Sequence, residues 1–288
     1  MTQWLVLTIV IVLICIVEWI REISTFKITH YNIDSDKLNQ LKKEQKIVFL
    51  TDLHNNSYGK NNEKLIQAIR SQKPDLILIG GDMLIGKTGV STQVAEDFIK
   101  NISEICPIYY ANGNHEQRMK VYFEEYGLKY QEYKSRIQKM GVCFLENEQI
   151  DIHFDDCDVQ ITGLEVPKEG YKKFKKTYIS IEQIEACIPK ADTSKFQILL
   201  AHHPSYADTY LKWGADLVLC GHLHGGVVRI PGIGGVITPQ YCLFPKYSGE
   251  LTRLDDKFIV VSKGLGTHTI KMRFLNPAEV VVLHLRGK

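Results

Sequence analysis

Short apolar runs alternate with longer segments of helical spacing along most of the chain. The runs contain three or four residues and are typical of strands buried on both faces. They lie at 47–50, 76–79, 108–110, 198–200 and 217–219. Segments with apolar residues three and four positions apart separate them and predict helices. These lie at 62–71, 94–105 and 181–187. The alternation predicts an α/β fold with helix-covered sheets.

The second half of the chain adds further strand-like segments. Two of them, 150–154 and 159–162, are separated by Asp155 and Asp156, which predict a turn between paired strands. The segments at 142–145 and 280–285 are the others. We detect no repeat period and no long linker, so one α/β domain accounts for the region.

One longer segment, residues 117–140, has helical spacing throughout and predicts a single long helix. Tyr122, Tyr126, Tyr130 and Tyr133 follow one another at intervals of three or four residues. Such an aromatic stripe is usually the face that a helix packs against the core. We therefore expect these tyrosines to be packing residues and not a binding site.

The chain begins with an apolar stretch that carries no charge from Trp4 to Val17 and is followed by Glu18, Trp19 and Ile20. The 17 residues from Trp4 to Ile20 are long enough to span a bilayer at about 1.5 Å per residue. Trp4 and Trp19 lie at its ends, as in an interfacial aromatic belt. No basic residue precedes the stretch and no small-x-small cleavage site follows it, which disfavours a cleaved signal peptide. The pattern predicts a single-pass, uncleaved membrane anchor.

The first basic side chains, Arg21 and Lys27, follow the apolar stretch. By the positive-inside rule this arrangement favours the cytoplasmic side of the membrane for the rest of the protein. We expect an anchor at residues 1–21, a stalk or edge segment at 22–45 and one domain at 46–288.

Composition narrows the class of protein further. Of 288 residues, 44% are hydrophobic and 24% are charged, which excludes intrinsic disorder. The net charge is only +2, so no nucleic-acid partner is expected. The seven cysteines include no CxxC pair and predict neither a disulfide framework nor a zinc ribbon.

Five of the apolar runs end in polar residues that can bind metal ions. The carboxyl ends of strands are where open α/β sheets hold their ligands, so these tips are expected to converge. The candidate residues, in chain order, are Asp52, His54, Asp82, Asn114, His202, His222 and His224.

The candidate ligands are carboxylates, imidazoles and one carboxamide, which suit Mn, Fe or Zn. They are too many for one tetrahedral ion but fit two ions about 3.5–4 Å apart that share a carboxylate and activate water. In the pairs Asp52-x-His54 and His222-x-His224, the spacing puts both side chains on one side of an extended tip. A loop after the strand can instead direct the two side chains to adjacent ions.

The motifs DLH, GGD, GNHE, HHP and GHLH occur in an order that resembles the calcineurin-like metallophosphoesterase family over residues 46–288. The tail, with GHLHGGVVRIPGIGG, Gly264-Leu265-Gly266 and Arg273-Phe274, is similar to the membrane-associated YkuE/YaeI-like branch. The resemblance implies a four-layer sandwich: two packed mixed β-sheets flanked by helices, here preceded by a transmembrane helix.

The resemblance also implies two divalent metal ions (Mn, Fe or Zn) and a role for each motif residue. Its ligand assignments are Asp52, His54 and His224 on the first ion, Asp82 bridging, and Asn114, His202 and His222 on the second. His115 would be catalytic, stabilising the phosphate or protonating the leaving oxygen. Glu116 occupies the place of the family's usual aspartate and is expected to act outside the ligand set at most.

The function implied is hydrolysis of phosphodiester, phosphomonoester or pyrophosphate bonds by a metal-bridged hydroxide. The anchor points to lipid-linked or membrane-proximal substrates. The resemblance to the YkuE/YaeI-like branch also implies, as a minor hypothesis, cleavage of the UDP-2,3-diacylglucosamine pyrophosphate bond in lipid A synthesis. Arg229 and Lys87 are candidate contacts for a substrate phosphate, although a solvated or sheet-edge cation explains each equally well.

Two other functions fit part of the sequence. Residues 81–88 satisfy the pattern GxxxxGK[ST] of a P-loop NTPase, but the helix that should begin at Lys87 and Thr88 meets Gly89, and Ser91 or Thr92 is a better N-cap. The other alternative is a non-catalytic metal-binding protein.

The lysine cluster at 172–176 fits a solvated helix face or contact with anionic headgroups. His203 is expected to be structural.

Overall fold

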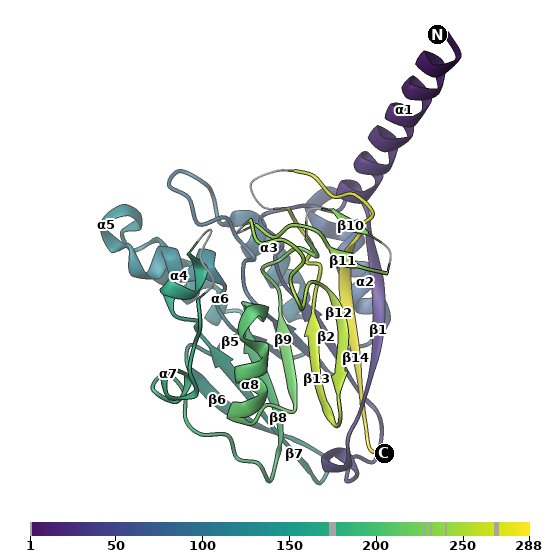
Figure 1. Ribbon diagram of the computed structural model, residues 1–288. Coiled ribbons are helices and arrows are strands. Elements are labelled where there is room, and N and C mark those ends of the chain that lie inside the picture. The colour runs from purple at the N-terminus through teal and green to yellow at the C-terminus, as the bar shows by residue number, and fades with distance from the viewer. Residues whose placement is uncertain (1, 173–176, 227, 231, 240, 268–270) are drawn as a thin grey trace.

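The fold is seen in a computed structural model (Figure 1). It describes residues 2–172, 177–226, 228–230, 232–239, 241–267 and 271–288. Most of the lysine cluster, at 173–176, and His268 lie outside the described residues.

The first of two six-stranded sheets contains the strands that precede three of the ligand motifs. Its central strands β2, β3 and β4 are parallel, and β14 runs antiparallel to β2. β1 pairs in parallel with β14 at one edge, and β5 pairs in parallel with β4 at the other. The order is β1 (Phe26–Asp34), β14 (Ala278–Arg286), β2 (Gln45–Leu50), β3 (Leu76–Ile79), β4 (Ile108–Tyr110) and β5 (Cys143–Phe144).

The second sheet contains the strands that precede the histidine motifs. Four parallel strands, β13, β9, β8 and β7, form its centre, and an antiparallel strand closes each edge. The order is β12 (Glu250–Leu254), β13 (Lys257–Val261), β9 (Leu217–Cys220), β8 (Phe196–Ala201), β7 (Cys157–Leu164) and β6 (Glu148–Phe154). A short separate ribbon pairs β10 (Arg229–Ile230) with β11 (Gly234–Gly235).

The alternation of side chains along each strand explains the layers. In β2, Ile47 and Phe49 pack in the core between the two sheets, whereas Val48 and Leu50 pack toward helices. In β9, Leu217 likewise faces the other sheet. Both faces of each sheet are therefore covered, which confirms the expected sandwich of two mixed sheets flanked by helices.

The helices form the two outer layers. The first sheet is covered by α2 (Glu63–Gln72), α3 (Gln93–Ser103), α4 (Asn114–Val121) and α6 (Lys129–Gln138), with the short α5 (Phe123–Tyr126) between the last two. The second sheet is covered by α7 (Ile181–Glu185) and α8 (Ala207–Trp213). Short 3₁₀ turns are η1 (Asp36–Leu38), η2 (Lys60–Asn62), η3 (Lys168–Tyr171) and η4 (Pro204–Tyr206).

The single long helix expected at 117–140 is wrong, because the chain forms α4, α5 and α6 there. The backbone leaves the helical region at Tyr122 (φ −94°, ψ 65°), and Gly127 has a φ of 56° that an L-residue adopts at a cost. Tyr126, Tyr130 and Tyr133 are buried in the core as expected. Tyr122 lies at the break and is 41% exposed.

Helix α1 (Thr2–Ser24) projects from the domain, as Figure 1 shows. An 18-residue window within Gln3–Ser24 has a mean hydropathy of 2.4, and the helix is long and apolar enough to cross a membrane, although a signal sequence has the same properties. After α1, β1 joins the first sheet directly. β1 is parallel to β14 and β14 is antiparallel to β2, so α1 meets the sheet at the end where β2 finishes.

Candidate metal centre

The loops that carry the candidate ligands meet at one end of the sandwich. Those after β2 and β3 remain hydrogen-bonded beyond their strands, since Asp52 N–H donates to Gly81 O (2.9 Å) and His54 N–H to Asp82 O (3.1 Å). The loop after β9 is joined to them through His222 N–H, which donates to the Asp52 carboxylate (3.0 Å). The candidate ligands that follow the strands of the first sheet therefore face those that follow the strands of the second sheet.

The backbone at the ligands is strained. The φ angles lie in the left-handed region at Asp52 (55°), His54 (47°), Asp82 (53°), His222 (67°) and His224 (49°). Each such non-glycine residue costs about 1–2 kcal/mol, and strain of this kind gathers at functional sites. The expectation of extended tips is therefore wrong. His222 and His224 are directed to different groups, whereas Asp52 and His54 share one.

Three overlapping groups of ligand atoms form the centre. In the first, His224 Nε2 and His54 Nε2 lie 3.4 and 3.6 Å from Asp52 Oδ1. In the second, which also contains His222, His202 Nε2 lies 3.1 Å from Asp82 Oδ2. The third contains His54, Asp82 and His115. Atoms within each group lie within 4.8 Å of one another.

The surroundings of these side chains fit metal ions. The Nδ1 atoms of His202 and His224 contact backbone carbonyls, those of Gly80 (2.7 Å) and Gly266 (3.2 Å). This arrangement directs the Nε2 atoms toward the aspartates, where they can bind a cation. Among the described residues, the buried atoms Asn114 Oδ1 and His222 Nε2 have no hydrogen-bond partner. Buried polar atoms rarely remain unpaired, so these two atoms also fit as cation ligands.

Close approach of the loops leaves no room for larger residues. A Cβ added at Gly221 would lie 2.2 Å from Asp52 Oδ2. Gly81, with a φ of 92°, turns the chain after β3 so that Asp82 faces the histidines.

The electrostatics are those of anionic carboxylates held among imidazoles. Burial favours the neutral carboxyl, but the nearby histidines outweigh it and hold the pKa values of Asp52 and Asp82 below their usual range. Burial also opposes a charge on His202, yet the two aspartates raise its pKa to about 10. Burial, together with His203 and His202, lowers the pKa of His222. Cations bound here would replace protons.

His115 faces the same centre from the start of α4. The Gly86 N–H donates to His115 Nδ1 (2.9 Å), so the proton of the neutral ring lies on Nε2. The ring itself lies in a group with His54 and Asp82. The His115 backbone N–H also donates to Asp82 Oδ1 (2.8 Å), which ties α4 to the centre. This arrangement presents a proton donor beside the candidate ligands.

Glu116 contributes more than the sequence indicated. Its buried carboxylate accepts hydrogen bonds from the backbone N–H groups of Asp82 (2.8 Å), Met83 (2.9 Å) and Gly113 (3.1 Å), and from the Tyr110 hydroxyl (2.7 Å). Burial, and to a lesser degree Asp82, raises the pKa of Glu116 to about 7. Glu116 thus fixes the backbone that positions Asp82.

The loop before β14 supports His224 through residues for which no sequence motif predicted a role. Asn276 Nδ2 donates to the carbonyls of His224 (2.6 Å) and Gly226 (2.7 Å). The buried guanidinium of Arg273 donates to Gly266 O (2.5 Å), the carbonyl that also contacts the His224 ring. The Arg273-Phe274 motif was the only sequence signal for this support.

A cavity of about 400 Å³ opens beside the centre. It contains Asn114 and His222, and Tyr171 lies against His222 with ring centroids 5.1 Å apart. The buried Tyr171 hydroxyl has no hydrogen-bond partner within the described ranges. The remaining lining residues combine cationic and apolar side chains: Arg118, Lys168, Lys172, Gln117, Val121, Tyr122 and Pro239. The sequence analysis did not single out Tyr171, Arg118 or Lys168.

Three of the weaker candidates lie in other settings. Arg229 pairs with Glu250 (2.8 Å) and lines a different cavity, whose lining contains none of the seven candidate ligands, so its contact with substrate stays a prediction. Lys87 is exposed. His203 accepts the Ser205 N–H (3.2 Å) at the start of η4.

The P-loop alternative does not fit the fold. No helix begins at residues 87–88; α3 begins at Gln93 with Thr92 as its N-cap. The Asp82 carboxylate faces His202 instead of forming part of a phosphate loop.

Comparison with known proteins agrees with this geometry. The sequence model of the family "Calcineurin-like phosphoesterase" matches residues 45–226. The chain is 26% identical over 243 residues to the phosphodiesterase YaeI of Escherichia coli, covering 83% of this chain and 82% of YaeI. It is 27% identical over 250 residues to the metallophosphoesterase YkuE of Bacillus subtilis, covering 84% and 79%. These matches confirm the resemblance found in the sequence.

A solved structure shows the same fold. The phosphopantetheinyl hydrolase PptH of Mycobacterium tuberculosis superposes with a TM-score of 0.51 at 12% sequence identity, covering 78% of this chain and 92% of PptH. At this identity the likeness concerns the fold alone.

Proposed function

We propose that the seven candidate ligands bind two divalent cations at which a phosphate ester is cleaved. The premise is that the chain belongs to the calcineurin-like phosphoesterase family and is a metal-dependent hydrolase of phosphoric esters. The observation that carries the proposal is the convergence of the candidate ligand side chains at one place. Two buried aspartates and four histidines from four separate strand ends lie within bonding reach of shared cations, with Asn114 alongside. The ligand division implied by the family matches the first and second groups.

Two bound cations would supply an activated water and neutralise the charge of the phosphate oxygens. Asp52, Asp82 and the histidines hold the charge and geometry that such cations need. Water adds to phosphorus on the side opposite the leaving oxygen, and the bond to that oxygen breaks. His115 Nε2–H would donate a hydrogen bond to the departing oxygen and stabilise its negative charge, because the Gly86 N–H keeps the ring proton on Nε2. The departing oxygen then takes up the proton that the attacking water releases. Asn114 lines the cavity beside the centre together with His222.

The cavity beside the centre supports an anionic substrate with an apolar part. Arg118, Lys168 and Lys172 supply positive charge, and Val121 and Tyr122 supply apolar surface. We infer that the substrate is a phosphodiester or pyrophosphate, and that it is lipid-linked or lies next to a membrane. The diester preference draws on the name of YaeI. A UDP-diacylglucosamine pyrophosphate bond, as in lipid A synthesis, is the narrowest form of this proposal.

We further propose that α1 anchors the enzyme in the membrane as a single-pass helix. Its apolar residues are exposed and its last turns contact the domain through Trp19 and Glu22, which supports retention of the helix in the mature protein. Arg21 and Lys27 favour the cytoplasmic side for the catalytic domain.

The test uses the purified full chain in detergent. Hydrolysis of bis-p-nitrophenyl phosphate should disappear after treatment with a chelator and return with Mn, Fe or Zn, with two equivalents of metal bound. A panel of phospholipids, nucleotides and sugar pyrophosphates then ranks substrates by kcat/KM. Full metal loading without turnover of any of these esters would favour the alternative of a non-catalytic metal-binding protein.

A further inference from the structure

One surface segment of the protein is apolar and exposed although most of its described residues lie in loops. Residues 230–245 contain no Asp, Glu, Lys or Arg. Ile233, Leu243 and Phe244 within this segment are 65%, 64% and 56% exposed. Loops in contact with water are normally polar, and exposed apolar side chains gathered in one region indicate a surface that meets another apolar phase.

A second segment extends this surface. Residues 271–276 lie beside the residues that lead into the first segment, since Arg229 N–H donates to Phe274 O (3.1 Å) and Val228 forms a bridge with Phe274. Leu275 of this second segment and Ile233 of the first line one cavity. Met272 and Leu275 of the second segment are 39% and 45% exposed. We call the set Ile233, Leu243, Phe244, Met272 and Leu275 the apolar rim.

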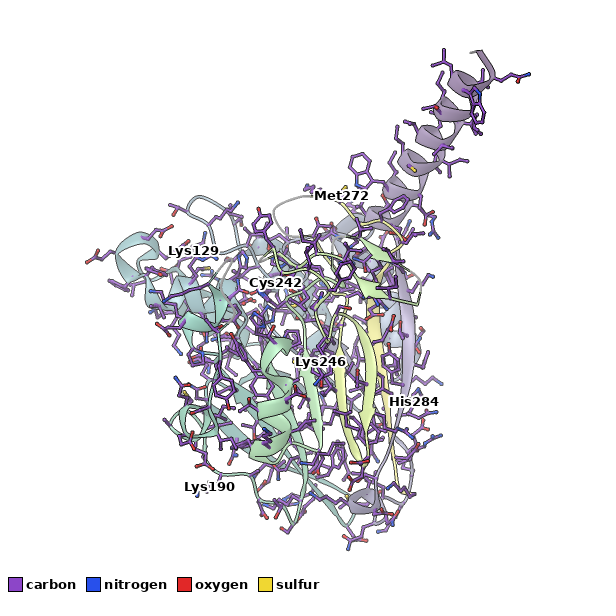
Figure 2. The ribbon with its side chains drawn as sticks, viewed as in Figure 1. Lys129, Lys190, Cys242, Lys246, Met272 and His284 are labelled. Atoms are coloured by element: carbon purple, nitrogen blue, oxygen red, sulfur yellow. The ribbon has the colours of Figure 1, made fainter. Side chains whose placement is uncertain are left out.

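The part of the rim formed by Met272 and Leu275 lies where α1 joins the domain. The Trp19 indole donates to Lys271 O (2.8 Å), and Asn276 N–H donates to the Glu22 carboxylate (2.8 Å). Residues 271 and 276 bracket Met272 and Leu275, so these side chains are at the level of Trp19. Figures 1 and 2 show the base of α1 next to Met272, with Lys190 at the far end of the domain.

Trp19 also marks the end of the apolar stretch, because Ile20 is the last apolar residue before Arg21. A tryptophan in this position typically lies at the membrane–water interface. If α1 spans the bilayer, the contacts of Trp19 and Glu22 bring the rim to the same interface. Tyr241, 50% exposed, and the exposed Lys271 add the aromatic and cationic residues that such an interface favours.

The rim is connected to the metal centre by short contacts. Asn276, next to Leu275, donates to His224 O, and Arg273, next to Met272, donates to Gly266 O. A rim held at the membrane would thus keep the loops of the centre beside the lipid headgroups.

We propose that the apolar rim inserts into the interfacial layer of the membrane that α1 spans, so that the domain lies on the phospholipid surface with its metal centre at headgroup level. The inference rests on the membrane anchoring proposed for α1. Lipid is the occupant because the same membrane already surrounds the residues that precede Trp19, and the rim needs no further partner to be covered.

The experiment places the photoreactive residue p-benzoylphenylalanine at position 243 of the full chain, reconstituted into vesicles of phosphatidylethanolamine and phosphatidylglycerol. The matched control carries it in place of Leu254, an apolar residue that is 40% exposed at the end of β12 remote from the centre. After irradiation, mass spectrometry should find at least ten times more phospholipid adduct at position 243 than at 254.

Equal adduct yields at the two positions would overturn the proposal, as would cross-links from position 243 to a second protein chain in place of lipid. A second variant, Leu243→Asp with Phe244→Asp, should lower lipid adducts from a probe at position 233 at least fivefold and leave hydrolysis of a soluble diester unchanged. Extraction of the chain by alkaline carbonate would contradict the anchor itself. Loss of diester hydrolysis in the unmodified protein would contradict the proposed reaction, whereas lipid adducts do not depend on turnover.

Discussion

His115 is the residue whose role depends most on one atom. Its Nδ1 accepts the Gly86 N–H, and its ring centroid lies 4.8 Å from that of His54. We expect His115→Ala to lower kcat by about 10²- to 10³-fold, the usual cost of removing one donor to a developing negative charge, and to retain both metal ions. Steady-state kinetics combined with metal analysis checks this. Loss of an ion from this variant would make His115 a ligand and refute the assignment.

Asn114 is expected to show the opposite pattern. Its buried Oδ1 has no partner among the described residues, so its contribution should come from a cation. Asn114→Ala should bind about one metal ion fewer and lose at least about 10²-fold in kcat, since the activated water depends on both ions. The control Asn101→Ala changes an exposed asparagine whose side chain donates to the Asp97 carbonyl, and it should have no effect. Full metal content in Asn114→Ala would contradict the assignment.

A substitution at Tyr171 tests the cavity without replacing any candidate ligand. Its hydroxyl is buried and unpartnered within the described part of the chain, next to His222. A substrate oxygen that accepts this O–H would be worth about 0.5–1.5 kcal/mol, so Tyr171→Phe should raise KM about 2- to 12-fold with little change in kcat. Tyr178→Phe, at a tyrosine that is 75% exposed, is the control. An unchanged KM would remove Tyr171 from the substrate site.

The sequence could identify candidate ligands because each follows a short apolar run in a recognisable motif. It could not identify the roles of Tyr171, Glu116 or Asn276. Those roles depend on contacts such as that between Asn276 and His224, 52 positions apart, which no local pattern encodes.

At the scale of elements, the apolar runs located the strands well. The run at 76–79 is β3 and the run at 108–110 is β4. Buried strands have a strong signal because both of their faces contact apolar layers. The prediction of one long helix at 117–140 was wrong because helical spacing continues through Tyr122 and Gly127, where the backbone leaves the helix. Spacing reports which face is buried, not where the hydrogen bonds stop.

The junction between α4 and the end of β3 depends on Glu116, which makes a prediction at this scale. Glu116→Gln replaces one acceptor oxygen with an NH₂ group that faces backbone N–H donors. We expect the free energy of unfolding to fall by about 2–4 kcal/mol, the cost of leaving buried donors unpaired. Denaturant titration of metal-free protein measures it. Glu124→Gln, at an exposed position of α5, should change stability by less than about 0.5 kcal/mol. Equal effects of the two substitutions would contradict the role of Glu116.

For the whole molecule, the candidate centre lies across the interface between the two sheets. The first group joins Asp52 and His54, after β2, to His224, after β9, and the second joins Asp82, after β3, to His202 and His222. Each cation would therefore bind both sheets at once. The strain at the five left-handed ligand residues adds to the cost of the metal-free fold.

Metal binding should consequently stabilise the entire domain and not only its loops. Because ions bind the native state alone, Mn²⁺ at about 100 times its Kd should add about 2.7 kcal/mol per site, and raise Tm by about 5–10 °C for each site in a domain of this size. Scanning calorimetry of chelator-treated full chain, with and without Mn²⁺, measures the shift. In Asn114→Ala the shift should be about half as large, because one site is impaired, whereas Asn101→Ala should match the unmodified protein. A local change at the loops with no change in Tm would mean that the two sheets are not joined through the ions.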